Sequence, residues 1–148
     1  MTFAPELAEL GPDRWTLPFW EAAREGRLVA PVCPRCDRGR MPPTSHCPHC
    51  GASDAPDWEP TSGQARVFSY TVAHQAFHPA LGEHVPYVLA IVALVDRPDV
   101  RLATNLLEVD TEAVQIDDLV EVVFDRVDDD TVIPRFRPAN GGSTQPGG

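Results

Sequence analysis

The sequence contains no lysine, so 12 arginines carry all of its positive charge against 22 acidic residues, for a net charge of −10. Proteins that track nucleic-acid phosphates usually present a basic face, because released counterions supply most of their non-specific affinity. The composition therefore argues against nucleic-acid binding. Most of the acidic excess lies after residue 96, whereas residues 24–40 hold five arginines and only two acidic residues.

Long apolar runs are also missing. The longest, residues 87–95, has nine residues, whereas a helix that spans a bilayer needs about 20. No basic stretch followed by an apolar one opens the sequence, so we find no secretory signal. We therefore expect a globular protein of the cytoplasm that has no membrane partner.

Motifs for independent catalysis are absent as well. The sequence has no phosphate-cradling glycine loop, no nucleophile elbow and no plausible Ser/His/Asp order. His74, His78 and His84 lie in one loop, but a general base must be positioned and desolvated, and a loop with glycine and proline indicates neither. We interpret this loop as solvated or as part of an interface, and we predict no catalytic residue.

Cysteine occurs only four times, and all four residues fall within 18 positions. They form two C-x-x-C pairs, Cys33 with Cys36 and Cys47 with Cys50. Because cytosolic thiols stay reduced, such pairs indicate a metal site rather than disulfides. A redox C-x-x-C would need a helix pattern after it, and none follows either pair.

Four thiolates complete a tetrahedral site and leave no position for a reacting water, so the predicted metal is structural. We predict zinc, and the sequence leaves iron open. His46 and His49 are interpreted as solvated neighbours of the site. Arginines around the site form a solvated surface or bind a phosphorylated ligand or an acidic partner, for which the planar guanidinium is suited.

The chain before the cysteines contains one predicted helix. Residues 1–12 show no sustained period and predict a flexible lead-in. A short helix follows, in which Thr16 caps the first turn and Gly26 ends the last. After it, residues 27–33 read as a strand that enters the first cysteine pair, and residues 39–47 as the return to the second.

An aromatic cluster on this helix admits two interpretations. Trp15, Phe19 and Trp20 offer more surface than so short a helix can bury against itself. They therefore pack on the core of the domain or contact a partner, because exposed aromatic clusters usually mark interaction sites.

From residue 63 the pattern changes to strands without intervening helices, which is typical of a small closed barrel. The expected strands lie within residues 64–75, 85–96, 100–109, 118–127 and 131–138. The second is apolar at every position from residue 87 to residue 95, so both of its faces must be covered. The zinc module, the N-terminal helix or another chain would cover its outer face.

Taken together, these patterns predict four segments. They are a lead-in (1–12), a helix with a zinc module (13–60), a barrel (61–138) and a disordered tail (139–148).

The motifs in this order resemble a known family whose members join an N-terminal helix and a rubredoxin-like zinc ribbon to a five-stranded OB-fold barrel, a mainly β architecture. The resemblance rests on "FW" at 19–20, "CPRC" at 33–36, "CPHCG" at 47–51, "PYVLAIVAL" at 86–94 and "PRFRP" at 134–138. Two departures are Asp37, where the family often has glycine, and the absence of an arginine near Thr44.

The resemblance implies a non-catalytic subunit that forms a hetero-oligomer with a thiolase-like or lipid-transfer-protein-type aldolase and helps to shape its acyl-CoA site. It favours a retro-aldolase that acts on steroid side-chain or other acyl-CoA substrates. The expected partner contacts are Trp15, Phe19 and Trp20, and the expected contacts to acyl-CoA phosphates are Arg35, Arg38 and Arg40. Two alternatives stay open, namely a free-standing acyl-CoA carrier or sensor and a nucleic-acid-binding OB module.

Overall fold

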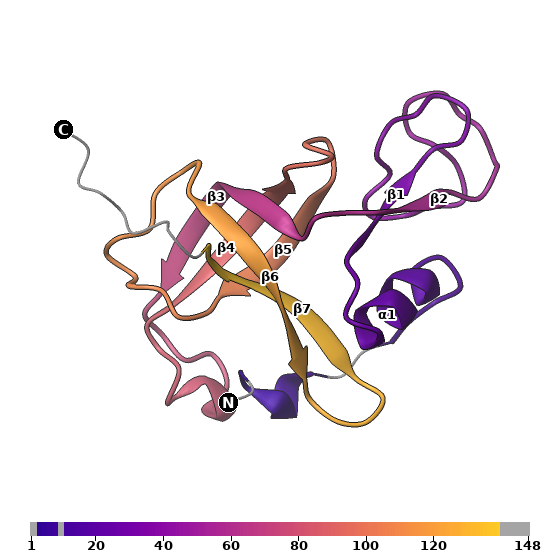
Figure 1. Cartoon of the computed structure of the whole chain (residues 1–148). Coiled ribbons are helices and arrows are strands. Elements are labelled where there is room, and N and C mark those ends of the chain that lie inside the picture. Colours follow the sequence, from indigo (N-terminus) through magenta and orange to yellow (C-terminus); the bar gives the residue numbers. More distant parts are fainter. Residues whose placement is uncertain (1–2, 9–10, 140–148) are drawn as a thin grey trace.

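In a computed structural model, which describes residues 3–8 and 11–139, a five-stranded barrel is joined to a helix and a two-stranded sheet that lie beside one another (Figure 1). The elements are η1 (Pro5–Leu7), α1 (Leu17–Arg24), β1 (Val29–Val32), β2 (Asp57–Pro60), β3 (Gln64–Ala73), η2 (Pro79–Leu81), β4 (Tyr87–Leu94), β5 (Arg101–Leu106), β6 (Leu119–Arg126) and β7 (Val132–Pro138). The predicted mainly β architecture is confirmed. In the described part of the chain, no helix is both long and apolar enough to cross a bilayer.

The barrel closes in the strand order β3-β4-β5-β7-β6, and all five predicted strands are present. Neighbouring strands are antiparallel except for β5 and β7, which meet in parallel where Leu106 faces Phe136. Strand residues alternate between the two faces, and those that point inward fill the barrel. Val67, Val88, Val92 and Phe136 are each 0% exposed.

A β-bulge in β3 shapes the outer surface of the barrel. The register with β4 shifts between Val67 and Ser69, which leaves Phe68 as the extra residue. The Phe68 side chain is 48% exposed, and the guanidinium of Arg101 on β5 lies 3.8 Å from the centre of its ring. The bulge therefore places an aromatic ring and a cation together on the outer face.

The zinc module contains a strand that the sequence analysis missed. The predicted return over residues 39–47 has no strand, only one bridge between Val32 and Gly39. Pro42 and Pro43 in that segment have no N–H with which to continue a ladder. The partner of β1 is instead β2, which pairs with it in antiparallel register.

The start of α1 also differs from the prediction. The Thr16 side chain makes no capping hydrogen bond. Asp13 accepts the backbone N–H groups of Trp15 and Thr16 at 2.9 and 2.8 Å, because its carboxylate reaches the backbone two and three residues ahead. The end of the helix is as predicted, with Gly26 in the left-handed region at φ 73°.

Arg97, between β4 and β5, ties the zinc module to the barrel. Its guanidinium donates to the Glu59 carboxylate on β2 at 3.0 Å, and to the backbone and side-chain oxygens of Asp37 at 2.8 Å. Close by, Asp99 accepts the N–H of Gly39 at 2.7 Å. Buried residues of α1 and β1 belong to the same apolar cluster as the barrel interior, so the two parts share one core.

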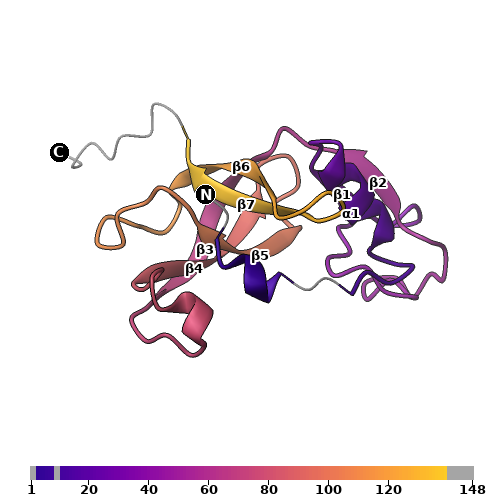
Figure 2. The ribbon, with the colours of Figure 1, turned by 90° about the horizontal axis from the view of Figure 1, so that it is seen from below.

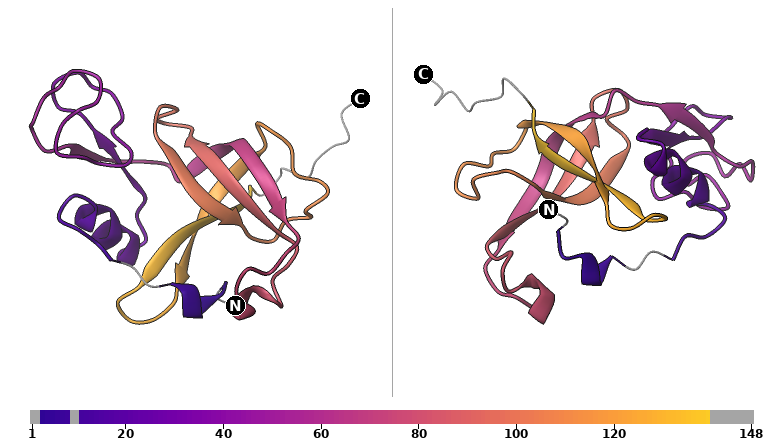
Figure 3. Two further views of the ribbon diagram at one scale, coloured as in Figure 1. Left: turned by 180° about the vertical axis from the view of Figure 1, so that it is seen from behind. Right: turned by 60° about the horizontal axis from the view of Figure 1, so that its bottom comes forward.

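The N-terminal segment differs from the predicted flexible lead-in, because its described residues contact the barrel and the loop before β4. The Phe3 ring packs 4.5 Å from the His84 ring and 5.3 Å from the Tyr87 ring. Arg135 donates to the carbonyl of Phe3 at 3.2 Å, and the Ala4 N–H donates to Nε2 of His84 at 3.3 Å. Figures 2 and 3 show this segment running along the barrel next to β5 and the loop that carries η2.

At the other end, Ala139 is buried, and its N–H donates to the carbonyl of Leu119 at 3.1 Å. The remainder of the predicted tail, residues 140–148, lies outside the described residues, as do residues 1–2 and 9–10 of the lead-in.

Gly39 provides a test of how tightly the zinc module sits on the barrel. A Cβ at this position would lie 2.5 Å from Cγ2 of Val100, which is only 1% exposed and cannot withdraw. We expect Gly39→Ala to lower the free energy of unfolding by about 1–3 kcal/mol, the usual range for overpacking. Urea unfolding measures this loss.

Gly11→Ala is the matched control, because a Cβ there meets no atom within 4 Å. Equal unfolding midpoints for the two variants would contradict the close docking.

Candidate metal centre

The four cysteine sulfurs converge on one point. All four Sγ atoms lie within 4.8 Å of one another. The Cys33–Cys50 and Cys36–Cys47 sulfurs are each 3.7 Å apart. A tetrahedron with Zn–S bonds of about 2.3 Å has edges of about 3.8 Å. The donor set and its spacing therefore fit a tetrahedral zinc ion, as predicted.

Both cysteine pairs lie on backbone turns of the same form. In the first, the N–H of Asp37 donates to the carbonyl of Cys33 at 2.9 Å, and in the second the N–H of Gly51 donates to that of Cys47 at 2.9 Å. Asp37 and Gly51 have φ values of 59° and 76°. Asp37 thus takes the left-handed place that glycine fills in the second turn, a conformation that aspartate tolerates better than most residues.

The crowded thiols have widely separated pKa values. Burial acts to raise the pKa of Cys47, but the N–H donors of Cys50 and His49 and the adjacent thiols lower it to about 6. The N–H of Arg38 acts to lower the pKa of Cys36, yet burial and the surrounding thiols outweigh it and raise that pKa to about 11. Near neutral pH the cluster therefore keeps protons unless a cation stabilises all four thiolates.

The surroundings of the cysteines match a closed site. Cys33 and Cys47 are 1% and 2% exposed, whereas Cys50 lies at the surface. His46 and His49 are both exposed. Among the described residues, the only cluster that could hold a metal is formed by the four cysteines. Four thiolates leave no position for substrate, so the site can organise the chain but cannot activate water.

The three arginines near the site have different environments. Arg40 is 1% exposed and donates to the backbone carbonyls of Asp54, at 2.7 Å, and Thr44. It is therefore part of the zinc module's interior, and the expectation that it contacts a phosphate is wrong. Arg35 and Arg38 are exposed, and Arg35 pairs with Asp54 at 3.0 Å.

The three aromatic residues in and just before α1 also differ in burial. Phe19 is 7% exposed, and its ring packs 5.1 Å from Trp20 and 6.4 Å from Trp58. Of the two interpretations, core packing describes Phe19. Trp15 and Trp20 are half-buried. For these two side chains, contact with a partner stays a prediction.

Two histidines of this loop make structural contacts, one within the loop and one to the N-terminal segment. Nδ1 of His78 accepts the N–H of Ala80 at 3.1 Å and caps η2. His84 holds the N-terminal segment, as described above. His74 and His78 are exposed.

A polar cluster on the outer face of the barrel was missed by the sequence analysis. Arg135 on β7 donates to Asp125 on β6 at 2.7 Å and also to Oδ1 of Asn105 on β5. Asp125 and Arg135 lie on consecutive strands, whereas Asn105 lies on β5, earlier in the sequence. The alternation of β7 could have placed Arg135 outward, but no local signal identifies its partners.

Two family models match this chain, one over the zinc module and one over the barrel. Residues 20–56 match the family model described as the ChsH2 rubredoxin-like zinc ribbon domain, and residues 58–125 match the ChsH2 C-terminal OB-fold domain. A solved chain described as "Ltp2-ChsH2(DUF35) aldolase" is similar, with a TM-score of 0.76 and 36% identity, over 88% of this chain and 98% of that chain.

Two curated relatives differ in length. A "Probable enoyl-CoA hydratase alpha subunit" of Thermomonospora curvata is 40% identical over 122 residues, which are 82% of this chain but only 37% of that protein. The chain thus spans just over a third of this relative. A "DUF35 domain-containing scaffold protein" of Methanocaldococcus jannaschii is 28% identical over 119 residues, or 80% of this chain and 82% of that protein.

Replacing Cys33 and Cys36 by alanine tests the metal centre. We expect elemental analysis to find one zinc per wild-type chain and none in the double variant, because two thiolates cannot complete the site. All three tryptophans, Trp15, Trp20 and Trp58, precede the barrel. Their fluorescence should therefore shift to the red as the zinc module unfolds, while far-ultraviolet circular dichroism keeps the signal of the barrel strands.

Ser53→Ala is the control for this measurement, since it changes an exposed side chain beside the second cysteine pair. Iron in place of zinc, or unchanged tryptophan emission after metal loss, would refute the expected site.

Proposed function

The chain belongs to the ChsH2 family of the DUF35 proteins, and on this premise we propose that it is a non-catalytic scaffold subunit of an acyl-CoA aldolase complex. Its partner in this proposal is a thiolase-superfamily enzyme that performs retro-aldol cleavage of acyl-CoA substrates, such as those with a steroid side chain.

One observation carries the proposal. The similarity to the chain described as part of an Ltp2-ChsH2 aldolase extends over 98% of that chain, at 36% identity. The likeness thus includes the zinc ribbon, the helix and the barrel in one arrangement. The scaffold name of the Methanocaldococcus jannaschii relative agrees with a structural role.

The geometry suggests how such a subunit would act. The four thiolates hold the ribbon, Arg97 ties it to the barrel, and the two half-buried tryptophans of the helix region lie on the same unit. A rigid unit presents its anchors without a large loss of conformational entropy on binding. In this proposal the partner supplies the reacting groups, and this chain supports the shape of the shared site.

The acyl-CoA part of the proposal draws on two features. The Thermomonospora curvata relative is named as a subunit of an enoyl-CoA hydratase, whose substrate is an acyl-CoA. Arg35 and Arg38 are exposed beside the metal centre, and guanidinium groups are well suited to phosphates. We propose these two arginines as the phosphate contacts, without Arg40.

The nucleic-acid alternative has one feature in its favour. Phe68 and Tyr70 on β3 are 48% and 39% exposed, as stacking platforms require. However, Arg101 already lies over the Phe68 ring, and the net charge of −10 opposes binding to phosphates. The scaffold role therefore stays the favoured function.

Co-expression with a thiolase-superfamily aldolase from the same organism tests the scaffold role. We expect the two proteins to co-purify, and the isolated chain to show no turnover. A double change of Trp15 and Trp20 to alanine should weaken the complex by about 30-fold or more, since interface tryptophans commonly contribute about 2 kcal/mol or more. Analytical ultracentrifugation measures the dissociation constant.

Phe77→Ala is the control for these tryptophans, because this ring is 79% exposed on a loop away from the helix. Melting temperatures of all variants separate weaker binding from unfolding. Equal complex formation by the double variant and the control would exclude the tryptophans as anchors.

The proposed phosphate contacts are tested with a double Arg35→Ala and Arg38→Ala variant in the complex. We expect calorimetric titration with an acyl-CoA to show a dissociation constant raised about tenfold and a weaker dependence on salt, because charge-assisted contacts are lost. Arg24→Ala, an exposed arginine of the helix, should bind as the wild type does. Equally tight acyl-CoA binding by the isolated chain would favour the carrier or sensor alternative.

A further inference from the structure

A trough crosses the outer face of β4 and β5. Two hollows of about 700 and 460 Å³ lie on this face, and both are lined by Ile91 and Ala103. These two residues are direct register partners on the neighbouring strands. The two hollows therefore adjoin at this pair, and each has a size typical of small-molecule sites.

The two ends of the trough are formed by other parts of the chain. Phe3, Leu7 and Leu81, from the N-terminal segment and η2, line the larger hollow. Trp20 of α1 and Met41 of the zinc module line the smaller one. Between the ends, the floor is apolar, and Leu89 is still 44% exposed. An apolar molecule would thus be desolvated by this surface.

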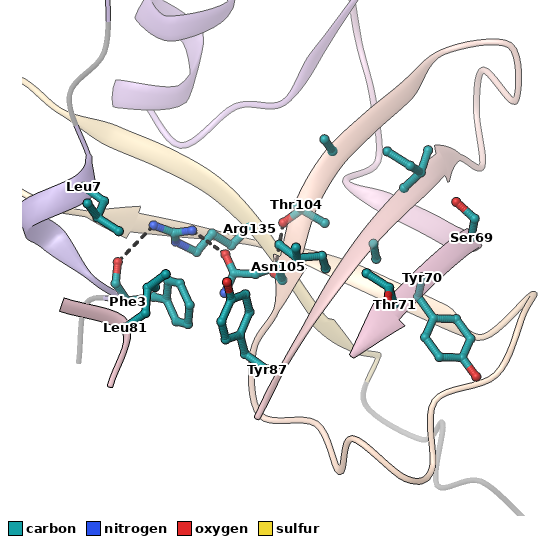
Figure 4. A pocket seen from close by; sticks show the side chains of 14 residues that line it. Phe3, Leu7, Ser69, Tyr70, Thr71, Leu81, Tyr87, Thr104, Asn105 and Arg135 are labelled. Carbon is teal, nitrogen blue, oxygen red and sulfur yellow. Dashed lines mark hydrogen bonds between the residues drawn. The ribbon is translucent and has the colours of Figure 1, made fainter. Parts of the chain in front are cut away.

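One polar group in the larger hollow has an unused hydrogen-bonding function. A guanidinium can only donate, so the contact from Arg135 requires that Oδ1 of Asn105 faces it. The amide nitrogen Nδ2 of Asn105 then points away from Arg135, toward the side of the hollow where Figure 4 places Tyr87 and Phe3.

This amide nitrogen is both buried and unpaired. Asn105 is 4% exposed, and its Nδ2 has no acceptor within the described residues. A buried donor without an acceptor destabilises a fold, and native proteins rarely keep one without a reason. The nitrogen is thus a donor positioned for an acceptor that comes from outside the chain.

The charges at this end indicate which acceptor fits. The positive charge of Arg135 is already neutralised by Asp125, whose carboxylate lies 2.7 Å from it. Nearby, Oγ1 of Thr104 donates to the backbone carbonyl of Asn105 at 3.0 Å. This end of the trough therefore offers one directed donor, no uncompensated charge and an apolar floor. At the other end, the guanidinium of Arg101 lies over the Phe68 ring.

We propose that the trough over β4 and β5 binds an uncharged apolar molecule that carries a carbonyl oxygen, with that oxygen accepting from Nδ2 of Asn105. The apolar body lies on Leu89, Ile91 and Ala103. Because the chain covers Nδ2, the aromatic side chains beside it shift when the ligand enters. The wall beside Nδ2 includes Phe3, whose segment is held by ring contacts with His84 and Tyr87 and by hydrogen bonds to Asp125, Arg135 and His84.

Two naphthalenes of nearly equal size test the proposal on the isolated full-length chain, independently of any partner enzyme. The probes are 2-acetylnaphthalene, which has a carbonyl, and 2-ethylnaphthalene, which lacks one. Asn105→Asp keeps an oxygen for Arg135 but replaces the donor by a second acceptor. Equilibrium dialysis gives the dissociation constant of each probe for the wild type and the variant.

We expect the preference for the ketone over the ethyl compound to fall about tenfold in Asn105→Asp, the usual consequence of losing one buried hydrogen bond. Ala103→Phe fills the floor of the trough from an exposed position and should weaken both probes by about tenfold or more. Ala76→Phe adds the same side chain at an exposed loop position outside the trough and should leave both dissociation constants unchanged.

Three results would overturn the proposal. They are failure of both probes to bind the wild type, an unchanged ketone preference in Asn105→Asp, and equal binding by Ala103→Phe and Ala76→Phe. Melting temperatures identify any variant that does not fold. If Asn105→Asp does not fold, the comparison of Ala103→Phe with Ala76→Phe alone decides whether the trough is the site.

Discussion

The convergence of four cysteine sulfurs is the constraint on which the front half of this protein depends. The sulfurs lie within 4.8 Å of one another, a spacing that thiolates tolerate only around a cation. The sheet that this cluster organises has two short strands, which are too few for independent stability without a staple. The metal centre thus substitutes for the large core that a module of this size lacks.

The zinc module is also part of a larger structure. Phe19 and Leu28 belong to the same buried cluster as the barrel interior, and Arg97 links the barrel to β2 and to the turn of the first cysteine pair. The wall that Met41 contributes to the trough depends on this docking. Loss of the metal would therefore affect a surface well beyond the four cysteines.

The outer face of the barrel has a polar region at its edge and an apolar region at its centre. At its edge, a half-buried ion pair between Arg135 and Asp125 anchors the N-terminal segment and the Asn105 amide. At its centre, Ile91 and Ala103 offer an apolar surface without side-chain polar groups. Such a combination of an apolar floor and one directed polar group is the usual composition of a small-molecule site. A scaffold subunit with this surface would contribute more than rigidity to a shared site.

The sequence by itself determined the features that depend on local spacing. Two C-x-x-C pairs predicted the metal centre, because this spacing brings the two cysteines of each pair together on one turn. The strand patterns after residue 63 predicted the five-stranded barrel. Only the tertiary structure decided that Arg40 and Phe19 are buried, that β2 pairs with β1, and that Arg135 donates to Asn105. These outcomes depend on contacts between residues far apart in the chain, whose distances no local pattern encodes.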